Sequence, residues 1–133
     1  MRFFKQNKLW RDKMIARAES EGSVIHWRKL DDTEFDQQLR AKLLEETHEV
    51  QTAQTSQELM SEIGDVMEVI DTLCTLHNLS KDAIVALQQK KTSERGGFNE
   101  RKYVETAEHP EGSFLANYCL KDPAKCPEIK IKD

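Results

Sequence analysis

Apolar residues recur at helical spacing over the middle of the chain. In residues 59–76 they follow one another three or four positions apart, which at about 100° per residue places them on one helix face. This face consists of Leu59, Ile63, Val66, Ile70 and Leu73. A second apolar stripe runs through residues 39–53, so the pattern predicts two consecutive long helices.

Polar residues that favour helix starts bound these two segments. The first helix is expected to open at one of residues 31–33 and to run to about residues 52–55. Ser56 is expected to cap the second, which should end near His77 and Asn78.

Two shorter segments also show a helical pattern. Residues 8–19 carry an apolar side made of Leu9, Met14, Ile15 and Ala18. Ser80 is expected to cap a further helix, which Gly96 would end as a C-terminal glycine. The sequence therefore predicts an all-α fold in which four helices form a bundle around one core.

One segment between the helices is β-prone instead. Residues 24–30 are typical of a short extended edge or of one arm of a small hairpin, with Phe98, Tyr103 and Val104 as candidate pairing residues. A small β-hairpin is thus a possible addition to the bundle.

The chain changes character after about residue 105. Residues 106–133 contain all three prolines and show little periodicity, so we expect a domain over residues 1–105 and a C-terminal tail over 106–133 that packs on it or extends from it. The wide apolar face of residues 59–76 predicts that the domain associates as a homodimer or homotetramer.

Charge and cysteine content narrow the classes of partner. A formal net charge of −4 argues against nucleic acid or an anionic membrane as the main partner, and no stretch resembles a signal peptide or a membrane span. The three cysteines are an odd number, without the spacing of a zinc site or of a disulfide framework. A reducing, cytoplasmic location is the expectation.

Each long helix carries two acids three residues apart. Glu46 and Glu49 lie on the first and Glu62 and Asp65 on the second, with twelve residues between the pairs. Residues three apart share a helix face, and both pairs fall toward the apolar side, where unpaired carboxylates are costly. The pattern predicts a site for a hard divalent cation such as Mg²⁺, with Mn²⁺ as the alternative. The simpler alternative is that these acids lie on a solvent-exposed helix face and bind no cation.

Three short blocks resemble a known family. Glu45-Glu46-x-x-Glu49 followed by Glu62-x-x-Asp65 is similar to the EExxE…ExxD signature of the all-α, MazG-like nucleotide pyrophosphohydrolases, a group that includes phosphoribosyl-ATP pyrophosphohydrolase. The segment KLWRDK at 8–13 resembles the KLVRDK opening of one subgroup, and KKTSERGGF at 90–98 resembles its KKxxxRGGF closing block. The resemblance covers about residues 7–105.

The resemblance implies an enzyme that hydrolyses nucleoside triphosphates between the α- and β-phosphates, as part of nucleotide-pool house-cleaning. Glu46, Glu49, Glu62 and Asp65 would be the metal ligands, and Glu45 would orient or deprotonate the attacking water. The implied contacts to the substrate phosphates are Arg11, Lys13, Lys91 and Arg95.

Two alternatives stay open at this point. The segment after Asp65, residues 66–68, lacks the histidine-containing continuation of the histidine-biosynthesis enzymes, which favours house-cleaning over phosphoribosyl-ATP hydrolysis. Trp10 also departs from the opening block, which bears on substrate access more than on the carboxylates. The other alternative is a non-catalytic helical dimer whose acids bind a structural cation or a basic partner.

Overall fold

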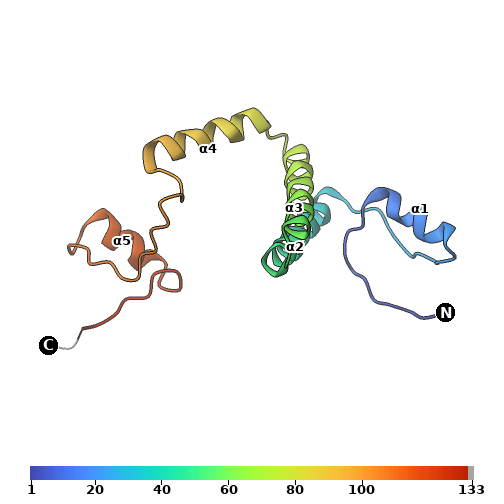
Figure 1. Ribbon diagram of the computed structural model, residues 1–133, viewed down its shortest axis with the longest axis horizontal. Helices are drawn as coiled ribbons and strands as arrows, with labels where there is room; N and C mark the ends of the chain where they lie inside the picture. The colour runs from blue at the N-terminus through green and yellow to red at the C-terminus, as the bar shows by residue number, and fades with distance from the viewer. Residues whose placement is uncertain (132–133) are drawn as a thin grey trace. The chain divides into compact units, whose positions relative to one another are not determined.

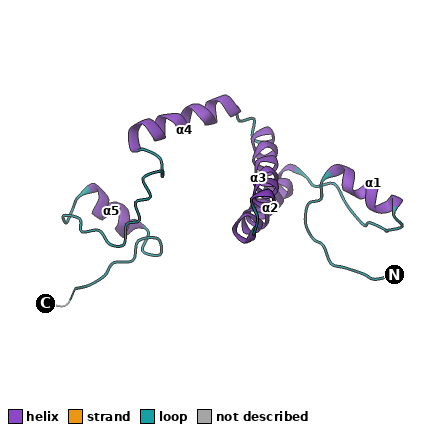
Figure 2. Cartoon of the chain, in the orientation of Figure 1, coloured by secondary structure: helices purple, strands orange, loops and turns teal. Residues whose placement is uncertain are grey.

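The computed structural model describes residues 1–131, and this part of the chain contains five helices and no strand (Figures 1 and 2). They are α1 (Asp12–Ser20), α2 (Asp32–Thr52), α3 (Ser56–Leu76), α4 (Lys81–Arg95) and α5 (Phe114–Lys121). The predicted all-α class is confirmed. The predicted β-hairpin is wrong, because residues 24–30 run without any strand partner.

Side-chain caps fix where the two long helices begin. Asp31 accepts a hydrogen bond from the backbone N–H of Glu34 at 2.8 Å and so starts α2 within the predicted range. Thr55, rather than Ser56, caps α3 by accepting from the N–H of Glu58 at 3.1 Å. The Glu58 carboxylate in turn accepts from the N–H of Gln54 at 2.9 Å, a variant of the capping box.

α2 and α3 form a helical hairpin. Only residues 53–55 separate them, and such a short connection makes the two helices antiparallel neighbours. They lie side by side in Figure 1, and they are the one pair of helices in residues 1–131 that packs closely along its length. The four-helix arrangement stays a prediction.

The hairpin has a narrow core. Its buried apolar side chains are Leu39 from α2 and Val69 and Cys74 from α3, and the carboxylate-bearing Glu46 of α2 is buried as well. Much of the predicted apolar face of α3 stays open in the single chain: Ile63 is 43% and Ile70 42% exposed, and Met67, which flanks the face, is 58% exposed. This open face is consistent with the predicted homo-oligomer, which is not itself observed.

The chain divides into two compact units, Met1–Glu94 and Arg95 onward. The first contains α1, the hairpin and nearly all of α4, which Ser80 caps as predicted. Gly96, at φ +80°, follows α4 in the left-handed conformation expected of a C-terminal glycine. The second unit contains α5, a helix that the tail's weak periodicity did not predict. The domain boundary at 105/106 stays a prediction.

Candidate metal centre

The hairpin brings the four predicted acids together. α2 supplies Glu46 and Glu49, α3 supplies Glu62 and Asp65, and one carboxylate oxygen from each lies within 4.8 Å of the others. This is the arrangement expected when two helices each present an i, i+3 pair to the other. The spacing in the sequence therefore identified the cluster correctly, while metal binding itself stays a prediction.

Two oxygens of the cluster are buried without a hydrogen-bond partner. Glu46 is only 7% exposed, and its Oε2 and the Oε2 of Glu62 both lack a donor. A buried polar atom left unsatisfied costs about 1–3 kcal/mol, and more when the group is charged. A bound cation would satisfy both atoms, so the residues present fit a divalent ion held by carboxylates.

The pKa values of two of the acids, Glu46 and Glu49, are raised. Burial raises the pKa of Glu46, and the neighbouring charge of Glu49 adds to this effect. For Glu49 the largest cause is hydrogen bonding with the Glu62 carboxyl, followed by burial, and together they raise its pKa. Glu46 and Glu49 therefore resist ionisation unless positive charge is brought to them.

Basic side chains meet this positive-charge requirement only in part. The Arg11 guanidinium lies 2.7 Å from Oδ1 of Asp65, and the Lys42 ammonium lies 3.5 Å from Oε1 of Glu46. Arg11 comes from the segment before α1 and reaches across 54 residues of sequence. Its predicted contact with phosphate stays a prediction, but the structure does place it at the cluster.

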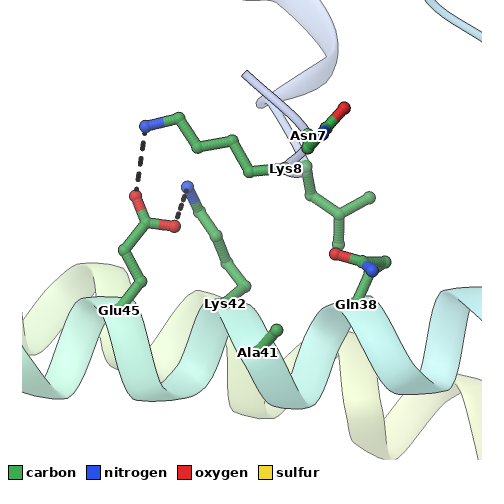
Figure 3. Close-up of a pocket in the computed structure, with 7 residues that line it drawn as sticks. Asn7, Lys8, Gln38, Ala41, Lys42 and Glu45 are labelled. Atoms are coloured by element: carbon green, nitrogen blue, oxygen red, sulfur yellow. Dashed lines mark hydrogen bonds and ion pairs between the residues drawn. The ribbon is translucent and has the colours of Figure 1, made fainter. Parts of the chain in front are cut away.

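Glu45 lies beside the cluster rather than within it. Lys8 and Lys42 converge on its carboxylate, with Nζ–O distances of 3.4 and 3.3 Å (Figure 3). Burial acts to raise the pKa of Glu45, but the two lysines outweigh it and the net shift is downward. Glu45 thus holds an ionised, lysine-bound carboxylate one residue from the candidate ligands, and its predicted role toward water stays a prediction.

A small pocket opens at this lysine pair. It has a volume of about 140 Å³, and its polar lining includes the amides of Asn7 and Gln38 beside the two ammonium groups (Figure 3). Lys8 and Lys42 were not among the predicted site residues. Lys42 was detectable, because it precedes Glu45 and Glu46 by three and four residues on one helix face.

The other predicted phosphate contacts are exposed. Lys13 lies in α1, and Lys91 and Arg95 lie in the last turns of α4. None of the three forms an ion pair with another residue of 1–131 within 4.0 Å. Their role toward a substrate stays a prediction.

Comparison with protein-family models, curated proteins and solved structures finds no match to this chain. The MazG-like resemblance therefore depends on the three sequence blocks. None of the helices in the described part of the chain is long and apolar enough to cross a membrane.

Proposed function

We propose that the chain is a divalent-cation-dependent nucleoside triphosphate pyrophosphohydrolase that cleaves between the α- and β-phosphates and yields a nucleoside monophosphate and pyrophosphate. The observation that carries this proposal is the cluster of four acids with two buried, unsatisfied carboxylate oxygens. A set of convergent carboxylates is typical of sites that hold Mg²⁺ or Mn²⁺ together with substrate phosphates.

The proposed roles follow from where each side chain lies. Glu46, Glu49, Glu62 and Asp65 would hold the cation from both helices of the hairpin. When bound, such a cation polarises a phosphoryl oxygen and lowers the pKa of coordinated water. The carboxylates contribute a fixed array of oxygens, so little reorganisation is needed on binding.

Arg11 and Lys42 are the basic side chains in contact with the four acids. The Arg11 side chain is 58% exposed and forms an ion pair with Asp65. In the proposed complex its guanidinium would leave this carboxylate and bind a phosphate oxygen instead. Lys42 is only 20% exposed and stays between Glu45 and Glu46, where it offsets part of the cluster's charge. Lys13, Lys91 and Arg95 complete the proposed phosphate contacts.

The proposal includes association of the hairpin with a second copy as a homodimer or homotetramer, in the cytoplasm. The open apolar face of α3 supports the association, because it would leave large side chains such as Ile63 and Met67 in contact with water in a monomer. The same face is also what favours the second candidate function, a non-catalytic helical dimer in which the acids hold a structural cation.

Product analysis tests the proposal. Purified protein is incubated with Mg²⁺ and a panel of canonical and modified nucleoside triphosphates, with phosphoribosyl-ATP included, and the products are separated by anion exchange. We expect monophosphate and pyrophosphate, lost with EDTA and in Glu62→Gln. Glu68→Gln is the matched control, because Glu68 is an exposed acid on the same helix and outside the cluster.

Other products would redirect the interpretation. Turnover of phosphoribosyl-ATP alone would replace house-cleaning by that activity, and diphosphate with phosphate would contradict the α–β cleavage. Cation binding without turnover of any substrate would favour the non-catalytic dimer.

A further inference from the structure

The unit that begins at Arg95 has few sheltered side chains. None of its described residues is buried, and five are half-buried: His109, Ser113, Ala116, Cys119 and Cys126. Units below about 40 residues rarely bury enough apolar surface to be stable without a disulfide, a metal or a partner. Two of the five sheltered side chains here are cysteines.

The backbone after α5 folds residue 126 back toward the end of that helix. The N–H of Asp122 donates to the carbonyl of Cys119 at 3.3 Å, and the N–H of Cys126 donates to the carbonyl of Asp122 at 2.9 Å. These two bonds make two consecutive turns. Together the turns return the chain over the eight residues from 119 to 126.

The residues that precede the two cysteines also meet. The Lys125 ammonium donates to the Tyr118 hydroxyl at 3.2 Å, and it lies 5.6 Å from the centroid of the Tyr118 ring. This contact spans the same two turns as the cysteines. It therefore shows, independently of the thiols, that the last turn of α5 and residues 125–126 lie against each other.

Both cysteines are free thiols. The neighbouring Cys126 thiol is the largest cause that raises the pKa of Cys119, with burial second. Cys74 differs in its surroundings, because it is buried in the core of the hairpin in the other unit. The chain thus has one paired site and one isolated core thiol.

We propose that Cys119 and Cys126 are a redox modification site, which low-molecular-weight disulfides convert to an intramolecular disulfide. One thiolate attacks the reagent disulfide, forms a mixed disulfide and releases one reagent thiolate. The second cysteine, after losing its proton, attacks the mixed disulfide and displaces the other reagent thiolate. In balance, the two protein thiols are oxidised by two electrons, and one reagent disulfide is reduced to two thiols.

The disulfide would tie the last turn of α5 to the turn that follows it. It would supply the covalent link that so small a unit lacks. The inference does not depend on the proposed hydrolase activity, since the acids lie in the other unit.

The test uses the full chain in a buffer that contains oxidised and reduced glutathione, with EDTA present. After acid quenching and alkylation, trypsin cleaves at Lys121 and Lys125, which separates the two cysteines into different peptides. We expect these peptides to be joined by a disulfide, and Cys74 to remain a free thiol in the native protein. Short loops give effective concentrations in the millimolar range, so at about 0.1 mM glutathione the joined peptides should exceed glutathione adducts about tenfold.

Variants with one cysteine replaced distinguish two thiols that react with each other from two thiols that react independently. Cys119→Ser and Cys126→Ser should each accumulate a glutathione adduct on the remaining cysteine, whereas Cys74→Ala should leave the joined peptides unchanged. The proposal would be overturned by separate adducts on both cysteines of the wild type, by disulfides between chains, or by no oxidation at either residue.

Discussion

Replacement of Glu46 by glutamine tests two effects of its buried carboxylate: the stability that it costs the metal-free protein, and the cation binding that it supports. Glu46 is almost fully buried, its Oε2 has no donor, and burial raises its pKa. Glutamine keeps the shape, removes the charge and can donate its amide N–H to the neighbouring Glu49. We expect the metal-free variant to be more stable than the wild type by about 1 kcal/mol, at the low end of the cost of an unsatisfied buried group.

The same variant should lose the stabilisation that a cation provides. A ligand at 100 times its Kd stabilises the folded state by about 2.7 kcal/mol. For a chain of this size 1 kcal/mol corresponds to about 4 °C in Tm. At pH 7.5 we therefore expect Glu46→Gln to melt about 4 °C above the wild type in EDTA, and the wild type to gain about 10 °C in saturating Mg²⁺ or Mn²⁺.

Differential scanning calorimetry with and without the cation measures both effects, and Glu68→Gln serves as the control on the same helix. The two expected shifts have opposite signs, so a general change in helix stability cannot reproduce them. The reasoning fails if Glu46→Gln keeps the full cation-dependent rise in Tm, or if it is less stable than the wild type in EDTA.

Three further predictions follow from the same geometry. Because the pKa values of Glu46 and Glu49 are raised in the folded state, these two groups bind more protons in that state than in the unfolded chain. In EDTA, the stability advantage of Glu46→Gln over the wild type should therefore shrink as the pH falls from about 8 to about 4.5. Chemical denaturation at several pH values measures this, and an advantage that does not change with pH would refute it. Arg11→Gln should tighten cation binding in the absence of substrate, by up to about fivefold, because an exposed ion pair such as Arg11–Asp65 contributes at most about 1 kcal/mol. Titration calorimetry tests this, and weaker cation binding would contradict it. Met67→Glu should convert the protein to a monomer at micromolar concentration in sedimentation velocity while its helical circular dichroism is retained. An unchanged oligomer would show that the open face of α3 is not the interface.

The helical hairpin and its acids were predictable because both depend on local periodicity. An i, i+3 pair on each of two adjacent helices needs only a short connection to face its counterpart, and the sequence shows both the spacing and the turn. The contacts of Lys8 with Glu45 and of Arg11 with Asp65 were not predictable. They join residues 37 and 54 positions apart. They also depend on the course of residues 8–11, which lie before α1 and not in the helix that the pattern predicted for residues 8–19.

Local sequence patterns gave a wrong prediction for residues 24–30 and did not predict α5. Residues 24–30 have β-branched and aromatic side chains, but a strand exists only where a partner supplies hydrogen bonds, and this segment has none. α5 has only eight residues, too few for periodicity to stand out. Its start was nonetheless marked by Ser113, which accepts from the N–H of Ala116 at 3.2 Å.

The three-residue connection between α2 and α3 has a consequence for folding. All four acids lie within residues 46–65, so every ligand contact is local in sequence and forms as soon as the hairpin closes. Segments of such low contact order fold quickly. Closure also brings the four carboxylates together, so the proposed cation binding would be thermodynamically linked to hairpin formation. A chelator would then act on this segment as a selective denaturant, and the metal as its folding cofactor.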